Sequence, residues 1–355
     1  MKKSLLAIAV LASIAGVANA QSSVVVYGIV DGGITAEHGG ANGSVTKLAT
    51  GVQQGNRLGF KGVEDLGNGL KALFQLESGF NLDTGTSRQG ALFGRQAFVG
   101  LSSNIGTVTL GRQYNLIFES LDTIDPFNTG LSGAASNLMA PGNRIQKDPA
   151  TSVIGNGNVR TNNAIVYATP TFSGFSAKAM YGAGEVAGNS STGRTLGASA
   201  NYVNGPVTVI AAYDKRNAGV VAPLADLKLA LIGATYDFGV AKVHAIAETE
   251  KSDIEASNYR NYLLGVSAPV GTGTALASFI DRSDRNSTAS GSKQYAVGYI
   301  HPLSKRTNFY TSYAHINNER NAQNVVGDAS NGGETSIPSL GNSSSALSVG
   351  IRHKF

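Results

Sequence analysis

The chain has 355 residues, a formal net charge of +5 at pH 7, 45 glycines and no cysteine. A chain of this length buries a sizeable core without disulfides, so a disulfide scaffold is excluded. The small charge excess, from 28 basic and 23 acidic residues, does not indicate a nucleic-acid partner, which requires concentrated Lys/Arg patches. Glycine at nearly twice its usual share of about 7%, without a G-X-Y period, excludes collagen and favours strands joined by tight turns.

The first 20 residues read as a secretory signal peptide. A basic start at Lys2 and Lys3 precedes the apolar run "LLAIAVLASIAGVA" and the small-residue pattern "ANA", so cleavage is expected between Ala20 and Gln21. The alternative is a membrane anchor, but a run of roughly fourteen apolar residues is too short to span comfortably. The mature chain, residues 21–355, loses two lysines and no acids, and so carries a net charge of +3.

From residue 23 onward the dominant hydrophobic period is two, which is typical of β-strands. "VVVYGIVDGGITAE" alternates, two runs flank a turn at residues 66–69, and two more flank a turn at residues 102–106. After residue 160 the pattern becomes regular, in pairs of runs joined by turns such as "FSGF", "NGP", "FGVA", "VGTG" and "LSKR". Longer polar segments separate the pairs. We count about sixteen strands, an even number that brings both termini to the same rim.

Strands of about ten residues, apolar on one face and small or polar on the other, suit a tilted strand that crosses an apolar band of about 25 Å. Because lipid cannot satisfy backbone polar groups, such a sheet has to close on itself. The last strand is therefore expected to pair with the first, "SVVVYGIV". In that last strand Leu347, Val349, Ile351 and Phe355 share the outward parity. The sequence thus predicts an all-β fold, a transmembrane antiparallel β-barrel.

A soluble β-sandwich or a solenoid is the alternative fold. A sandwich would have a second face rich in large apolar side chains, whereas here that face carries Gly, Ser, Thr, Ala, Asn, Lys and Arg, as a wet lumen does. A solenoid would repeat at a fixed period of about 20–50 residues, and the loop lengths vary too much for that.

The alternation stops between Tyr114 and Arg160, and we assign residues 116–159 to a constriction loop. Loops this long are usually functional or disordered. Disorder is disfavoured by the apolar residues Leu116, Ile117, Phe118, Leu121, Ile124 and Phe127. We expect this third long loop to fold into the lumen and to present Glu119, Asp122 or Asp125 to the pore.

A basic pore wall is expected opposite that loop. With Leu58 and Phe60 outward, Arg57 and Lys61 point inward. With Leu70, Ala72, Phe74 and Leu76 outward, the inward set is Lys71, Gln75 and Glu77. Placing Phe98 outward leaves Arg95 and Ala97 inward, and Arg160 opens the first strand after the loop. Each arginine alone reads as a surface residue, but three at comparable heights favour a basic wall.

A lumen with cations on one side and carboxylates on the other passes small ions and polar solutes without chemistry. The predicted function is passive diffusion with mild anion preference. A substrate-specific channel for anionic solutes is the nearer alternative; a barrel enzyme, such as a hydrolase, and an adhesin are others. Five scattered histidines, no G-x-S-x-G elbow and no metal-ligand spacing give no catalytic residue, cofactor or metal site. The histidines are His38, His244, His301, His315 and His353.

The sequence resembles the Gram-negative general diffusion porins, and the likeness runs from the signal peptide to Phe355. It is strongest at "VVVYGIVDGG", "NRLGFKGVEDLGNGLKALFQLESGF", "GRQAFVGL", "GTVTLGRQ" and "VGIRHKF". The resemblance implies a sixteen-stranded homotrimer in outer-membrane lipid, with the third loop inside each pore and small hydrophilic solutes and ions passing through. It also implies that Arg57, Arg95 and Arg160 face acidic residues of that loop. Where many members have Pro-Glu-Phe in the loop, this chain reads Asp125-Pro126-Phe127.

Overall fold

The computed structural model describes residues 23–139, 159–219, 226–252, 258–327 and 337–355. The predicted signal peptide and the latter part of the predicted constriction loop, residues 140–158, lie outside these ranges. The strands are β1 (Ser23–His38), β2 (Val45–Thr50), β3 (Arg57–Gly67), β4 (Leu70–Phe80), β5 (Ser87–Arg88), β6 (Gln96–Ser103), β7 (Gly106–Tyr114), β8 (Arg160–Ala168), β9 (Phe175–Gly182), β10 (Thr195–Asn204), β11 (Val207–Arg216), β12 (Leu227–Asp237), β13 (Lys242–Ser252), β14 (Asn258–Val270), β15 (Gly273–Asp284), β16 (Ser292–Pro302), β17 (Thr307–Asn318) and β18 (Ser344–Lys354).

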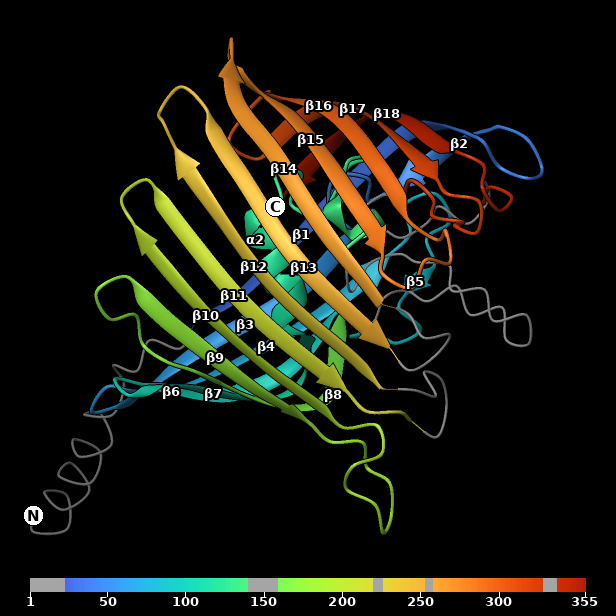
Figure 1. The fold of residues 1–355 in the computed structure, drawn as a ribbon. Helices are drawn as coiled ribbons and strands as arrows, with labels where there is room; N and C mark the ends of the chain where they lie inside the picture. Colours follow the sequence, from blue (N-terminus) through green and yellow to red (C-terminus); the bar gives the residue numbers. More distant parts are fainter. Residues whose placement is uncertain (1–22, 140–158, 220–225, 253–257, 328–336) are drawn as a thin grey trace, which may run out of the picture.

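All strands belong to one antiparallel sheet that closes on itself (Figure 1). β2 and β3 both pair with β1, and β5 and β6 both pair with β4, so each of these couples is one interrupted barrel strand. Counted in this way the sheet is a sixteen-stranded barrel. The predicted fold class, an antiparallel barrel of about sixteen strands, is confirmed.

Closure is made by the two ends of the chain. β1 pairs with β18 from Ile29 opposite Lys354 to His38 opposite Ser345. The Gly28 and Phe355 backbones then exchange two hydrogen bonds of 3.1 Å. Pairing of the last strand with the first was expected from the sequence, but it lies further along β1 than the expected segment of residues 23–30. Residues 28–38 of β1 pair with the end of the chain, whereas residues 23–27 pair with β3 on the other side. The aromatic end of the chain is therefore part of the barrel wall.

Short turns lie at one end of the barrel and long connections at the other. The predicted turns between β3 and β4, β6 and β7, β10 and β11, β12 and β13, β14 and β15, and β16 and β17 are all present, as is the predicted "FSGF" turn between β8 and β9. Gly69 in the first of these has φ +77°, and Gly205 in the third has φ +54°, a conformation that glycine adopts without steric cost. Such turns connect the two strands of each hairpin with few residues at the end of the barrel that carries the short turns.

The wall alternates between an apolar outer face and a polar or small inner face. In β18, Leu347 and Val349 are 47% and 54% exposed, whereas Ala346 and Ser348 are buried. The same alternation runs through β11 to β17. In β6, however, the outward set is Ala97, Val99 and Leu101, because Ala97 lies opposite the outward Leu76.

The predicted parity of β6 is therefore wrong. Phe98 lies opposite Gln75 on the inner face, and Ala97 points outward. Arg95 still reaches the interior because it precedes the strand, where its backbone N–H bonds the Glu77 carbonyl at 3.1 Å. Strict alternation cannot be extended across the irregular backbone between β5 and β6.

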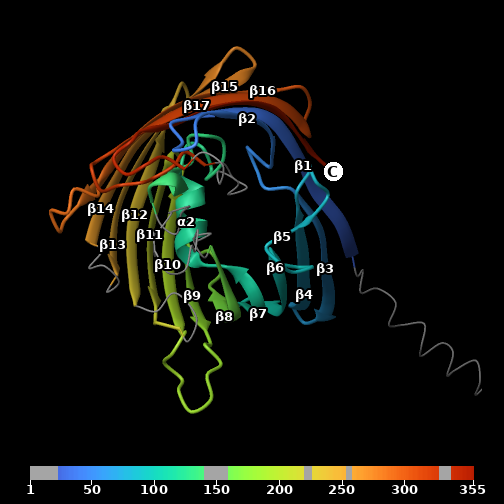
Figure 2. The same cartoon turned by 90° about the vertical axis from the view of Figure 1, so that its right-hand side faces the viewer.

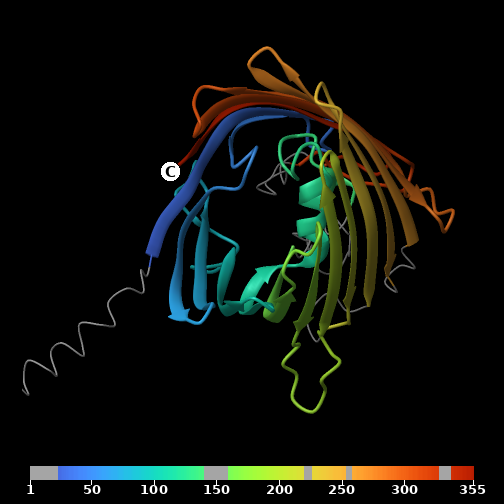
Figure 3. The same ribbon diagram turned by 90° about the vertical axis from the view of Figure 1, so that its left-hand side faces the viewer.

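The segment after β7 forms the helix α2 (Leu116–Ile124) and the 3₁₀ turn η2 (Ala135–Asn137). Figures 2 and 3 show α2 inside the ring of strands, alongside β10 to β12. None of the helices in the described ranges is long and apolar enough to cross a membrane. The buried apolar cluster includes residues of α2 and inward residues of β11 to β18, so it lies between this segment and the wall.

Candidate functional site

A cluster of arginines surrounds one carboxylate on the inner wall. Glu77 of β4 is only 2% exposed, and its Oε1 accepts a hydrogen bond of 2.6 Å from Arg95 Nε. The other oxygen, Oε2, accepts one of 3.0 Å from the Tyr27 hydroxyl and lies 3.9 Å from Arg57 Nη1. A buried carboxylate needs such partners to stay charged. The pairing joins β1, β3, β4 and the start of β6 at one level.

Tyr114, the last residue of β7, connects the remaining arginine to this cluster. Its hydroxyl oxygen lies 2.5 Å from Arg95 Nη2 and 2.8 Å from Arg160 Nη2, and both guanidinium groups donate to it. The Arg160 guanidinium also lies over the Tyr114 ring at 4.4 Å, within the range of a cation–π contact. The three predicted arginines are thus brought together, around one carboxylate and one phenol.

The same tyrosine also contacts α2. Its ring stacks on Phe118 with centroids 5.1 Å apart. Asn115 is the N-cap, and its Oδ1 accepts from the Phe118 backbone N–H at 2.9 Å, as capping residues commonly do. The helix therefore begins beside the arginine cluster.

The two faces of α2 differ in polarity. Leu116, Ile117, Leu121 and Ile124 are fully buried against the wall. Glu119 lies on the other face, where its carboxylate forms an ion pair of 2.7 Å with Lys178 of β9. This spacing of apolar residues is what holds an amphipathic helix on an apolar surface.

Inward glycines on alternate strands make room for the segment. A Cβ at Gly197 of β10 would lie 3.7 Å from Leu116, and one at Gly233 of β12 would lie 3.1 Å from Ile124. At Gly265 of β14 the nearest atom would be Pro126 Cγ at 2.7 Å, and at Gly298 of β16 it would be Phe127 Cε1 at 3.0 Å. The segment follows these glycines in chain order. We call them the glycine track (Gly197, Gly233, Gly265 and Gly298).

Hydrogen bonds from inward polar side chains fix the segment to the wall beyond α2. His244 of β13 donates from Nδ1 to the Ile124 carbonyl at 2.7 Å, since a carbonyl can only accept. Asn137 donates to Gln294 Oε1 of β16 at 2.8 Å, and Arg282 of β15 donates to the Leu138 carbonyl at 3.2 Å. Ser132 lies 3.0 Å from Ser348 of β18, hydroxyl to hydroxyl.

A second inward fold lies between β2 and β3, at residues 51–56. The buried Asp31 carboxylate holds it, accepting from the backbone N–H groups of Gln53 and Gln54 at 2.9 and 2.7 Å and from the Tyr310 hydroxyl at 2.7 Å. The Gly55 carbonyl in turn accepts from Arg57 Nε at 3.0 Å. This fold orients Arg57.

The two aspartates predicted to face the pore have different surroundings. Asp125 is 1% exposed and accepts backbone hydrogen bonds from Phe127, Thr129 and Ala135 at 3.1, 2.9 and 2.8 Å. Burial raises the pKa of its carboxyl to about 7, against the lowering effect of these bonds. These three hydrogen bonds join Asp125 to the backbone of its own segment.

Asp122, within α2, is the second of these aspartates. Burial raises the pKa of its carboxyl, while a 2.5 Å hydrogen bond from the Thr129 hydroxyl and the positive charge of Arg57 act in the opposite direction. Of the two aspartates, Asp122 is the one on whose pKa the charge of Arg57 has a lowering effect.

The remaining predicted residues lie apart from the cluster. Lys61 is inward and exposed, with Nζ 5.3 Å from the centre of the Tyr27 ring. Lys71 lies opposite Asp65, close to the turn between β3 and β4. Six residues separate Lys71 from Glu77, about 20 Å along a strand. Glu119 faces Lys178, so its charge is directed to β9.

Sequence reasoning missed several inward charges and the phenol between the arginines. Arg216 lies 2.8 Å from Asp214, and Arg282 lies 2.9 Å from Glu250. Asp214 and Arg216 are two residues apart in an alternating run, so both side chains lie on the inward face of β11. This spacing is the signal in the sequence that could have identified the pair. Tyr114 gave no such signal. Its hydroxyl accepts from Arg160, which is 46 residues away in the sequence and lies beside Tyr114 only because β8 pairs with β7.

A closed barrel with an apolar outside and a charged inside defines a membrane channel protein. A sequence model of the Gram-negative porin family matches residues 7–321. The chain is 35% identical, over the full length of both proteins, to outer membrane porin protein 32 of Delftia acidovorans. It is 32% identical to an outer membrane porin protein of Bordetella pertussis, again over both full lengths.

The solved structure of an anion-selective porin from Comamonas acidovorans superposes with a TM-score of 0.81 at 33% identity, covering 94% of this chain and all of that one. The chain belongs to the Gram-negative porin family. It is an outer-membrane diffusion channel and not an enzyme, as the resemblance in its sequence implied.

Proposed function

We propose that the channel passes small hydrophilic solutes and ions with a mild preference for anions. The observation that carries this proposal is the ratio of charges at the cluster: Arg57 and Arg95 lie at the carboxylate of Glu77, and Arg160 is joined to them through the Tyr114 hydroxyl. A ring of fixed positive charge attracts anions and repels cations at the narrow part of a pore. The similarity to a structure described as an anion-selective porin supports the same preference.

The segment that includes α2 sets the width of the passage in this proposal. Its support is the packing of α2 against inward residues of β10 to β13 and the hydrogen bonds to β13, β15, β16 and β18. A lumen narrowed in this way has the arginines on one side and Asp122 on the other. Opposite charges on the two sides create an electric field across the lumen. This field favours the passage of ions and of polar solutes whose dipoles can align with it.

Planar-bilayer recordings test the preference directly. In a potassium chloride gradient the reversal potential should indicate more permeant chloride than potassium, and the preference should fall as salt screens the fixed charges. Arg57→Gln combined with Arg95→Gln should shift selectivity toward cations. Lys71→Gln, which removes a lysine near the turn, is the control and should change it little. Cation preference in the unaltered protein at about 0.1 M salt would refute the proposal.

We also propose that three copies assemble through the outer face of β1 to β7. Its support is the distribution of outward tyrosines, the residues that mark membrane interfaces. Within the described chain they all lie on β8 to β17. They are Tyr167, Tyr181, Tyr202, Tyr213, Tyr236, Tyr262, Tyr295, Tyr299 and Tyr313. The face of β1 to β7 instead exposes aliphatic residues such as Ile34, Leu48 and Val99, at 60%, 60% and 55%. A second copy of the chain fits a face with this composition.

A further inference from the structure

The outer face of the barrel carries a group of cations on neighbouring strands. Lys228 of β12, Lys251 of β13, Arg260 of β14 and Lys293 of β16 have the outward parity of their strands, next to buried inward residues. All four lie within a few residues of the long connections and not of the short turns. We call them the basic row (Lys228, Lys251, Arg260 and Lys293).

The register places these residues at a similar level. Lys228 lies directly opposite Lys251 on one side and opposite Lys215 on the other. Arg260 lies opposite Thr249, two residues from Lys251 in β13. Like charges directly opposite each other in a sheet are destabilising unless something compensates them. Lys215, Lys228 and Lys251 form such a series of like charges on the outside of the barrel.

Few groups in the described chain offer that compensation. No ion pair joins any member of the basic row to a described residue, and Lys215 lies 3.8 Å from Asp226. Asp281 is the acidic residue on the outward face of this region, opposite Lys293 and Tyr262. Its Oδ2 accepts a 2.6 Å hydrogen bond from Ser283. The row keeps a clear excess of positive charge.

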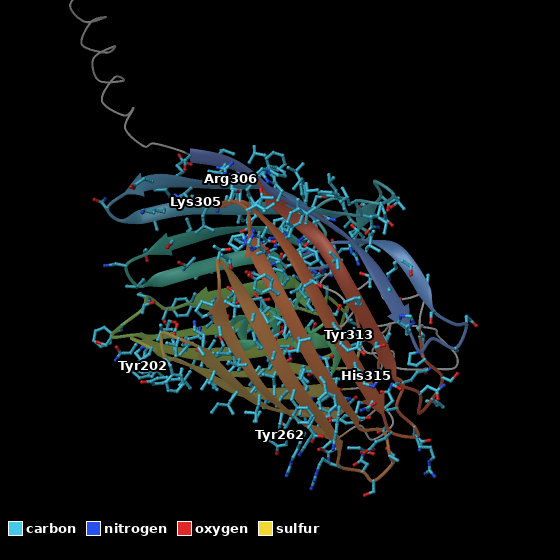
Figure 4. The ribbon with its side chains drawn as sticks, turned by 90° about the horizontal axis from the view of Figure 1, so that it is seen from above. Tyr202, Tyr262, Lys305, Arg306, Tyr313 and His315 are labelled. Carbon is cyan, nitrogen blue, oxygen red and sulfur yellow. The ribbon has the colours of Figure 1, made fainter. Side chains whose placement is uncertain are left out.

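Tyrosines fix the depth of the row relative to the membrane. Tyr262 lies two residues from Arg260 and Tyr295 two residues from Lys293, each on the outward face toward the middle of the strand, and they are 48% and 49% exposed. Figure 4 shows Tyr262, Tyr313 and His315 toward one end of the strands, and Lys305 and Arg306 toward the other. Interfacial tyrosines sit at the headgroup level. The basic row therefore lies among headgroups, about 7 Å further out.

We propose that the basic row binds the phosphate groups of a phosphorylated glycolipid in the outer leaflet of the outer membrane. The long connections of such barrels face the cell exterior, so the row meets the outer leaflet. Lys and Arg on neighbouring strands about 4.8 Å apart extend over about 20 Å from β12 to β16, enough to contact more than one phosphate of a lipid headgroup. A free phosphate ion would lack the acyl chains that pack beside Leu264 and Val297, which are 62% and 56% exposed.

The test compares two double variants with the same loss of charge, each made in the full chain in neutral detergent with a chelator. Lys251→Gln with Arg260→Gln removes half of the row. Lys305→Gln with Arg306→Gln, in the turn at the opposite rim, is the control. Binding of bisphosphorylated lipid A is measured by native mass spectrometry. The row variant should bind about 25-fold more weakly, since each Lys or Arg near an anionic membrane surface contributes roughly fivefold. The control should bind as the unaltered protein does.

Two further arms separate the sources of the effect. Lipid A without its phosphates should bind the unaltered protein as weakly as the row variant binds the phosphorylated form. Inorganic phosphate at millimolar concentration should not displace the lipid.

Asp281→Asn should strengthen binding several-fold, which keeps the test decisive if the row variant fails to fold. Equal binding by the two double variants, tight binding of dephosphorylated lipid, or displacement by free phosphate would overturn the proposal. Conductance of the row variant should be unchanged, so failure here is separate from failure of the pore proposal.

Discussion

At the scale of single residues, the charges of the cluster differ in their access to water. The side chain of Arg95 is 6% exposed and lies 2.6 Å from the Glu77 carboxylate. The side chain of Arg57 is 19% exposed and lies further from that carboxylate, at 3.9 Å. In the proposed pore, an entering ion therefore has better access to the charge of Arg57 than to that of Arg95. Arg95 and Tyr114 serve to hold the arrangement in place.

Replacing Glu77 by glutamine tests this division. Glu77→Gln leaves the arginines without their counter-charge, so anion preference should rise. Removing one partner of a buried ion pair should also lower the stability by about 3 kcal/mol. The reversal potential in a salt gradient measures the first effect and thermal unfolding measures the second. Glu64→Gln, at an exposed outward position of β3, is the control for both. A reversal potential that moves toward cations in Glu77→Gln would contradict the assignment.

The buried Asp125 carboxyl predicts a dependence on pH. Its pKa is raised by burial to about 7, so the folded segment binds a proton that the unfolded chain releases near pH 4. The stability that this group contributes is present at low pH and falls as pH rises from about 4 to about 7. Asp122 and the His244 hydrogen bond to Ile124 are the nearby titratable contacts.

Infrared difference spectra measure this ionisation directly. The unaltered protein should show a protonated carboxyl band at pH 5.5 that is lost by pH 8.5, and Asp125→Asn should lack it. A spectrum identical in the two proteins across this range would mean that Asp125 is already ionised at pH 5.5.

At the scale of elements, Gly265 of the glycine track is the position where the wall most closely approaches the segment. Valine there would bring Cβ to 2.7 Å from Pro126, too close for both to stay in place. Overpacking of this kind costs about 1–3 kcal/mol and should push the segment toward the middle of the lumen. We expect Gly265→Val to lower the single-channel conductance. Ala268→Val on the same strand, outward and opposite Ala275, should leave it unchanged. Equal conductance in the two variants would show that the segment does not limit the current.

Regular elements were predictable from the sequence, because period-two alternation and short Gly-containing turns are local. The inner positions of Arg57 and Glu77 followed from the same alternation. The parity of β6 did not, because the backbone between β5 and β6 is irregular and Arg95 lies just before the strand. The inward fold at residues 51–56 was also missed, since it depends on Asp31 and Tyr310, which are 279 residues apart. The glycine track becomes visible only when alternate strands are placed side by side.

At the scale of the whole molecule, closure joins the first strand, β1, to the last residue, Phe355. Gly28 leaves space for Phe355: a Cβ there would lie 2.3 Å from the phenylalanine ring. The last residue thus fills a gap beside the first strand while its backbone completes the ladder. Closure is needed because an open edge in lipid leaves backbone groups unpaired.

The uneven outer surface leads to a prediction about assembly. Val99 of β6 and Val297 of β16 are both outward and are 55% and 56% exposed in the single chain. The chain has no cysteine, so Val99→Cys and Val297→Cys each accept one spin label. If copies meet through β1 to β7, the label at position 99 should be immobilised and shielded from oxygen dissolved in the lipid. The label at position 297 should stay mobile and accessible. Similar oxygen accessibility at the two positions would place the contact on another face. Dilution with unlabelled protein separates protein contact from local packing, since spin–spin broadening at position 99 should disappear while the immobilisation remains.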